Sequence, residues 1–179
     1  VSDLIPITKI INNCLYKKKA LFADYSYDQT YKALQRRERD GDQTATYYIC
    51  QLLFDHFGAD ADYQEELYKR EAKGNETAAK FVTDAIYHQN SLSEEERFNL
   101  LLTRAHAGEN QAQWYVYSAL HRGDMGQGNR SSMSRYNDLL TFDQQGSYVA
   151  AYYICDSLYE GNLEYALPEN PSPNARYAE

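Results

Sequence analysis

Residues Thr44–Phe54 read TATYYICQLLF, and residues Val149–Tyr159 read VAAYYICDSLY. Both stretches contain Tyr-Tyr-Ile-Cys, and the second begins 105 residues after the first, which is three times 35. A sequence period in the thirties is typical of proteins built from stacked helical hairpins. The two copies therefore predict an array of helical pairs, with further units between them.

Four glycines mark these units, at steps of 33, 34 and 38 residues. Each has a leucine seven positions before it and an alanine four positions after it. Position seven after each glycine is aromatic, position eight is isoleucine or valine, and position twelve is leucine or isoleucine. Around Gly41, Gly74, Gly108 and Gly146 these columns contain Leu34, Leu67, Leu101 and Leu139; Ala45, Ala78, Ala112 and Ala150; Tyr48, Phe81, Tyr115 and Tyr153; Ile49, Val82, Val116 and Ile154; and Leu53, Ile86, Leu120 and Leu158.

Apolar residues at positions four, seven, eight and twelve lie on one side of a helix, so a first helix is expected after each glycine. A second helix is expected to end just before the next glycine, which permits the turn. The stretch from Ser93 to Glu96 has the capping-box pattern of a second-helix start. With a pair at about Leu4–Phe22 and Tyr27–Arg39 and a last helix at about Ser147–Glu160, we expect an all-α fold of about nine helices.

We expect one domain over residues 1–163, because 179 residues suffice for one ordinary domain with a sizeable core. Residues 164–179 are predicted to form a proline-containing C-terminal tail. The net charge of −8 and the pI near 5.0 disfavour nonspecific binding to nucleic acid and make a basic partner easier to accommodate. No apolar run approaches the roughly 18 residues of a membrane span, so we expect no membrane insertion.

The chain resembles the Sel-one-like branch of the tetratricopeptide repeat superfamily over roughly Asp28 to Gly161. The resemblance depends on the unit junctions KGNETAAKFV (73–82), AGENQAQWYV (107–116) and QGSYVAAYYI (145–154), which are similar to that family's Gly-x-x-x-Ala junction. The glycines at 123 and 161 fit its turn between helices. The resemblance implies a right-handed α-α solenoid of stacked helical hairpins.

Position nine after each glycine contains Cys50, Thr83, Tyr117 and Cys155, where the family usually has glycine. This position lies where the two helices of one hairpin touch, so Cys50 and Cys155 are predicted to be free, buried and structural. A disulfide between them would need Cα atoms within about 7 Å, which units three steps apart in a solenoid do not reach. Cys14 is a less favoured partner.

Other motifs do not point to chemistry. The three cysteines have no zinc-ligand spacing, and the four histidines have no HExxH motif, so no metal and no cofactor are expected. The glycine-rich stretch HRGDMGQGNR (121–130) follows a helix and is interpreted as an extended turn rather than a phosphate-binding loop. Its Arg-Gly-Asp tripeptide is too short to indicate a function. Because no nucleophile has a recognisable base, we expect no enzymatic activity.

The resemblance implies that first helices line a concave groove, with positions three, six, ten and thirteen after each glycine facing outward. Most side chains at positions six and thirteen are aromatic and include the only tryptophan, which suits a peptide- or protein-binding surface. Trp114 is the predicted anchor. The alternative is that these rings only pack between neighbouring repeats. The predicted binding residues are Tyr47, Gln51, Phe54, Lys80, Asp84, Tyr87, Trp114, Ser118, His121, Tyr152, Asp156 and Tyr159.

The expected function is therefore non-enzymatic binding of a protein or peptide partner. The resemblance implies a bacterial adaptor or immunity-type protein. Two alternatives stay open, namely a cytosolic signalling scaffold and an enzyme or enzyme accessory with a site in the groove. The oligomeric state is undetermined, and both the bacterial periplasm and the cytoplasm fit, with export slightly favoured. The chain opens on Val1 rather than Met, which fits removal of a leader by processing and by cloning equally.

Overall fold

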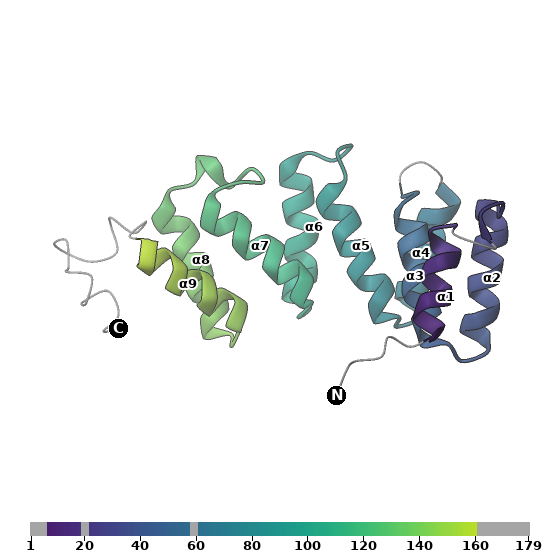
Figure 1. The fold of residues 1–179 in the computed structure, drawn as a ribbon. Coiled ribbons are helices and arrows are strands. Elements are labelled where there is room, and N and C mark those ends of the chain that lie inside the picture. Colours follow the sequence, from purple (N-terminus) through teal and green to yellow (C-terminus); the bar gives the residue numbers. More distant parts are fainter. Residues whose placement is uncertain (1–6, 19–21, 58–60, 161–179) are drawn as a thin grey trace, which may run out of the picture. The chain divides into compact units, whose positions relative to one another are not determined.

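A computed structural model describes residues 7–18, 22–57 and 61–160 (Figure 1). Within these ranges the chain forms nine α-helices, one short 3-10 helix and no strand, which confirms the all-α prediction for this part of the chain. The predicted C-terminal tail lies outside the described residues. The helices are α1 (Ile7–Tyr16), α2 (Tyr27–Arg39), α3 (Gln43–Phe54), α4 (Ala61–Ala72), α5 (Glu76–His88), α6 (Glu94–His106), α7 (Asn110–Arg122), η2 (Gln127–Asn129), α8 (Ser132–Gln144) and α9 (Tyr148–Glu160).

The predicted first helix is shorter than expected at its C-terminal end. Helix α1 ends at Tyr16 rather than near Phe22, and Lys18 has a φ of 48° in the turn that follows. Few non-glycine residues adopt this backbone conformation, and it is incompatible with continuing the helix. Helix α2 has the predicted bounds, and α9 begins one residue after the predicted start.

The chain divides into two compact units, residues 1–85 and residues 86–179, with the division falling within α5. In the first unit α1 packs against α2 and α3, and α3 also packs against α2 and α4. In the second unit α7 packs against α6, α8 and α9, and α8 packs against α9. In each unit a helix therefore contacts both its sequence neighbours and the helix two places away. The prediction of one domain over residues 1–163 stays a prediction.

Each repeat junction has the same turn. The four marker glycines have φ values of 90°, 82°, 86° and 87°, in the left-handed region that favours glycine. At Gly41 the glycine N–H donates to the Glu38 carbonyl, and the Asp42 N–H donates to the Arg37 carbonyl, both at about 3 Å. This pair of bonds is the Schellman motif, which satisfies the last carbonyls of the preceding helix. The same two bonds recur after α4, α6 and α8.

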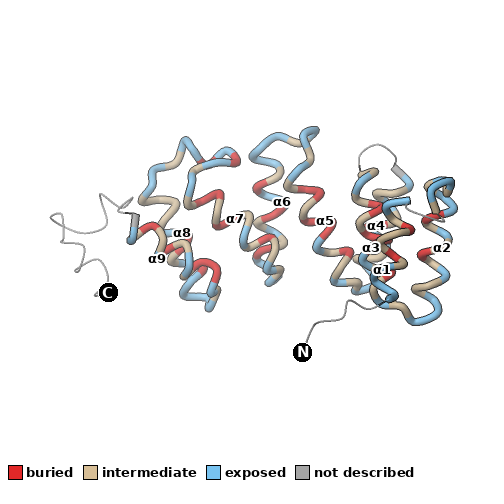
Figure 2. Tube along the Cα trace, viewed as in Figure 1, coloured by how far each residue is buried: buried red, intermediate tan, exposed pale blue. Residues whose placement is uncertain are grey.

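The predicted columns form the core, except that Tyr115, Tyr153 and Leu158 are half-buried. All four leucines seven positions before the glycines and all four alanines four positions after them are buried, as are the residues at position eight. Figure 2 shows these residues as red stretches along the helices, with the repeat turns pale blue. Alanine keeps this side of the first helix small enough for a neighbouring helix to approach closely.

Side-chain caps define several helix starts. The Ser93 hydroxyl accepts a bond from the Glu96 backbone N–H, and the Glu96 side chain accepts from the Ser93 N–H, which confirms the predicted capping box. Ser26 and Gln29 form a second capping box at the start of α2. Asp42 caps α3 and also binds Arg37 and Asn12, so one carboxylate joins α1, α2 and α3.

The prediction that position nine is buried is right in three of the four repeats and wrong in the fourth. Cys50, Thr83 and Tyr117 are buried, and the Tyr117 ring contacts Phe142 of α8 with a centroid distance of 4.7 Å. That contact joins the two helices of one hairpin, as expected. Cys155 is exposed instead, because α9 is the last described helix and no described helix packs over that side.

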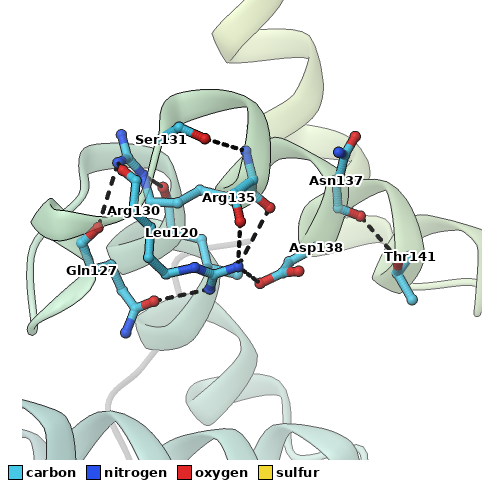
Figure 3. A network of polar contacts seen from close by, with 9 residues as sticks. Leu120, Gln127, Arg130, Ser131, Arg135, Asn137, Asp138 and Thr141 are labelled. Carbon is cyan, nitrogen blue, oxygen red and sulfur yellow. Dashed lines mark hydrogen bonds and ion pairs between the residues drawn. The ribbon is translucent and has the colours of Figure 1, made fainter.

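Two arginines hold the extended turn after α7, namely Arg130 before α8 and Arg135 on α8 (Figure 3). The Arg135 guanidinium donates to the carbonyls of Leu120 and Arg130 at 2.8 and 2.6 Å, so it satisfies the C-terminal end of α7. Arg130 binds the side chains of Gln127 and Asp138 at 3.0 and 2.7 Å. The turn is therefore a structural connection, in agreement with its interpretation from the sequence.

Within the Arg-Gly-Asp tripeptide the two charged side chains bind each other. Nε of Arg122 lies 3.0 Å from the Asp124 carboxylate. Gly123 has a φ of 76°, and a Cβ atom there would lie 3.0 Å from the Arg135 guanidinium. The backbone conformation therefore favours glycine at this position, and a side chain there would also have to displace the Arg135 guanidinium slightly.

Candidate binding surface

The twelve predicted binding residues all lie on first helices, and none of them is buried. Tyr47, Trp114, Tyr152 and Tyr159 are exposed to 50%, 36%, 53% and 72% of their surface. These values are high for large aromatic side chains on helices whose positions four and eight are buried. Position six is exposed in all four repeats, whereas at position thirteen only Tyr159 is exposed and the other three residues are half-buried. We use the name first-helix face for the exposed side of α3 and α5 in the first unit and, separately, for the exposed side of α7 and α9 in the second unit.

In the first unit, the aromatic side chains of this face belong to a cluster between α3 and α5. The Phe81 ring lies between Tyr47 and Phe54, with centroid distances of 5.5 and 5.6 Å. Phe54 is half-buried by this contact, so part of its area serves packing between neighbouring first helices, as the alternative interpretation expected. Lys80 of α5 is exposed and Asp84 is half-buried.

A ladder of polar side chains runs along α3 beside Tyr47. The Tyr47 hydroxyl lies 3.4 Å from Oε1 of Gln51, and the Gln51 amide donates to Asp55 at 2.9 Å. The Tyr16 hydroxyl of α1 donates to the other Asp55 oxygen at 2.5 Å. Burial, and then the hydrogen bond to Asp55, raise the pKa of Tyr16 well above its usual range. Tyr16 therefore stays a neutral hydrogen-bond donor at physiological pH.

Neither Tyr16 nor Asp55 was among the predicted residues. Asp55 follows the predicted position thirteen by one residue and stands four residues after Gln51. Side chains four residues apart on a helix are neighbours, so this spacing predicts a contact between Gln51 and Asp55. Tyr16 has no such signal, because it reaches this surface from a helix 39 residues away in sequence.

In the second unit, Trp114 of α7 lies against two tyrosines of α9. Its ring centroid is 5.5 Å from that of Tyr152 and 5.7 Å from that of Tyr153, with interplanar angles of 60° and 73°. The two tyrosine rings are themselves 5.2 Å apart at 80°. Such tilted and edge-to-face contacts are the preferred arrangements of aromatic pairs. We call these three residues the Trp114 cluster; Tyr153 was predicted only as a core residue.

An imidazole and a carboxylate lie beside the Trp114 cluster. The His121 ring contacts the Tyr153 ring at 5.5 Å, and Nε2 of His121 lies 3.6 Å from a carboxylate oxygen of Asp156. The sequence had placed both residues on this face separately, and the structure brings them together. Ser118 is half-buried on the same helix as His121.

Tyr87 packs against the next first helix. Its ring stacks on Tyr115 of α7 with a centroid distance of 4.0 Å and an interplanar angle of 9°, so much of one face is covered. Tyr87 therefore contributes an aromatic edge next to α7 rather than a free ring face. Its carbonyl accepts a bond from Arg97, which joins the end of α5 to α6.

In the part of the chain that the structure describes, no group of three or more histidine, cysteine or acidic side chains could hold a metal ion. Among the same residues, no helix is both long and apolar enough to cross a membrane. In each unit the first-helix face combines aromatic rings with polar and charged side chains, among them Gln51, Lys80 and Asp156. Such a surface can bury apolar groups and accept hydrogen bonds from a partner.

Comparison of the chain with protein-family models, with curated proteins and with solved structures gave no match.

Proposed function

We propose that this chain is a non-enzymatic protein-binding module, built as a right-handed α-α solenoid of the Sel-one-like, tetratricopeptide-like type. Two observations support this architecture. The same Schellman turn closes four successive helical pairs, and the same columns are buried around each turn. In each unit, first helices also contact one another, through Tyr47 and Phe81 or through Trp114 and Tyr152.

The observation that carries the function is the exposure of large aromatic side chains at equivalent positions. Tyr47, Trp114 and Tyr152 stand six residues after three different marker glycines, and all three are exposed. A repeat protein that served only as a spacer would gain nothing from exposed rings on this side. Tyrosine and tryptophan bury much apolar area on binding for little loss of side-chain entropy, which is why they dominate protein interfaces.

Trp114 is the proposed anchor of the interface. Its contacts with Tyr152 and Tyr153 fix the indole ring before binding, so little further order is lost when a partner covers it. Asp84 in the first unit and Asp156 in the second favour a basic partner and should chiefly speed association. By resemblance, the biological setting is a bacterial adaptor or immunity-type protein that binds a partner protein or peptide.

The test begins with affinity capture from the native cell, using the parent chain and a Trp114→Ala variant. The captured partner is then purified, and its dissociation constant is measured for both chains. Losing a central aromatic anchor typically costs about 2 kcal/mol, or roughly thirtyfold in affinity.

Leu100→Ala is the matched control for this experiment, because Leu100 is an exposed apolar residue of α6, a second helix in the same unit. The proposal expects this variant to bind as the parent does. If Trp114→Ala is folded and binds as tightly as the parent, the partner docks elsewhere and the proposal is wrong.

A further inference from the structure

A pocket of about 330 Å³ lies on the first unit, between α2 and α4 with α3 beneath. Its volume is at the lower end of those that hold small ligands or single side chains. Helix α2 contributes one face, with residues spaced at three to four positions, and α4 contributes the opposite face. The lining residues of this α2–α4 pocket are Tyr27, Asp28, Tyr31, Gln35, Leu53, Asp62, Tyr63 and Glu66.

Bonds to neighbouring groups fix the aromatic walls of the α2–α4 pocket. The Tyr27 hydroxyl donates to the Leu52 carbonyl at 3.1 Å, and its ring lies 4.7 Å from the Tyr63 ring. The Tyr31 hydroxyl donates to Oε1 of Glu66 at 3.2 Å across the pocket. Two helices therefore hold three tyrosine rings in place without a ligand, which lowers the entropic cost of binding one.

The charged side chains that line the α2–α4 pocket are all acidic. Its lining includes three carboxylates, those of Asp28, Asp62 and Glu66, and no basic residue. Nε of Arg70 lies 3.0 Å from Oε1 of Glu66. In the ion pair between Asp28 and Lys32, by contrast, both side chains are exposed. An exposed ion pair of this kind is weak, so displacing Lys32 from Asp28 would cost little free energy.

These features select one kind of ligand. Carboxylates at the rim repel anions, and covering them with an apolar group would cost desolvation free energy without compensation. A cation can instead interact with the ring faces and the carboxylates together. A guanidinium suits both, because its plane stacks on aromatic rings while its N–H groups bind carboxylates in a fork.

We propose that the α2–α4 pocket binds an arginine side chain of a partner peptide. The pocket lies mainly on α2 and α4 rather than on the first-helix face. The proposal for this pocket is independent of the proposed function. A partner with an arginine at a suitable distance would engage two surfaces of the same chain.

The test uses N-acetyl-L-arginine amide as the probe and the full chain as the receptor. Binding is followed by amide chemical shifts of α2 and α4. N-acetyl-L-citrulline amide, a neutral analogue of similar shape, is the matched control ligand, and N-acetyl-L-lysine amide tests the choice of guanidinium. We expect saturable shifts for the arginine probe, weaker binding of the lysine probe and no saturation with the citrulline probe.

The double variant Asp28→Asn with Asp62→Asn should weaken arginine binding by about fivefold or more, as two partly exposed charge interactions are lost. The matched control is Asp24→Asn with Asp40→Asn, which removes the same charge from exposed positions outside the lining. Tyr63→Leu keeps an apolar side chain beside Tyr27 and removes the ring face, so it should also weaken binding.

Three results would overturn the proposal. They are the absence of saturable shifts with the arginine probe, equal binding of the citrulline or lysine probe, and equal weakening by the control double variant. Trp114→Ala should leave binding of the probe unchanged. Failure at this pocket is thus distinguishable from failure of the proposed interface on the first-helix face.

Discussion

Replacing Arg70 by methionine should destabilise the first unit selectively. The Arg70 side chain is only 12% exposed and lies between carboxylates of two helices. It binds both oxygens of Glu38 on α2, at 2.9 and 3.2 Å, and Oε1 of Glu66 on its own helix at 3.0 Å. Although burial lowers the pKa of Arg70, the bonds to Glu38 outweigh it and raise the pKa, so the charge is held firmly.

The size of the effect follows from these contacts. Removing one partner of a fully buried ion pair costs about 3–5 kcal/mol, because the remaining charge loses its compensation. Glu38 and Glu66 are 27% and 36% exposed, so water replaces part of what they lose. Methionine keeps most of the apolar packing of the arginine stem. We therefore expect a loss of about 2 kcal/mol in the free energy of unfolding of this unit.

The assay combines urea denaturation with amide hydrogen exchange of α2 and α4, because two compact units need not unfold together. Lys69→Met is the matched control, since it removes the same charge from an exposed pair with Glu65. A double-mutant cycle with Glu38→Gln isolates the bond between α2 and α4. If Arg70→Met changes α2 exchange no more than Lys69→Met does, the reasoning about this buried network is refuted.

Three further predictions concern cysteine and arginine side chains. In the native protein Cys155 should react rapidly with a thiol reagent, while buried Cys50 should react only on unfolding; equal rates would contradict the described burial. Burial raises the pKa of the Cys50 thiol from 9.0 to about 11, so its neutral form is favoured in the folded state. The stability that this pKa shift contributes is full below about pH 9 and is lost towards pH 11. The difference in unfolding free energy between the parent and Cys50→Ala should therefore fall from about pH 9 to about pH 11. A difference that stays constant over this range would contradict the pKa shift of Cys50. Arg135→Lys should lower the thermal midpoint of the second unit, because lysine cannot bind the Leu120 and Arg130 carbonyls together; an unchanged midpoint would show that water satisfies these carbonyls.

Features that repeat along the sequence could be predicted well. Leu34 and Ala45 hold the same places around Gly41 as Leu101 and Ala112 hold around Gly108, and all four of these apolar side chains are buried. The reason is that helical period, glycine turns and capping boxes are local, with partners within a few residues. The outward positions came from the family resemblance, and position six, which it assigned to the surface, is exposed in all four repeats.

Features that depend on the neighbouring helix could not be predicted from the repeat. Cys155 occupies the same repeat position as Cys50, yet it is exposed because no described helix covers it. The bond between Tyr16 and Asp55 and the α2–α4 pocket arise from helices far apart in sequence. Periodicity assigns a residue to one side of a helix, but the partner on that side is a property of the packed structure.

Side-chain footprinting of the complex tests the central claim most directly. Hydroxyl radicals oxidise exposed aromatic and leucine side chains, so their rates can be compared for the chain alone and with its captured partner. We predict that oxidation of Tyr47, Trp114 and Tyr152 falls on binding, whereas exposed Tyr68 of α4 and Leu100 of α6 react as before. Protection of Tyr68 and Leu100 with unchanged oxidation of Trp114 would place the partner on the second helices and contradict the account.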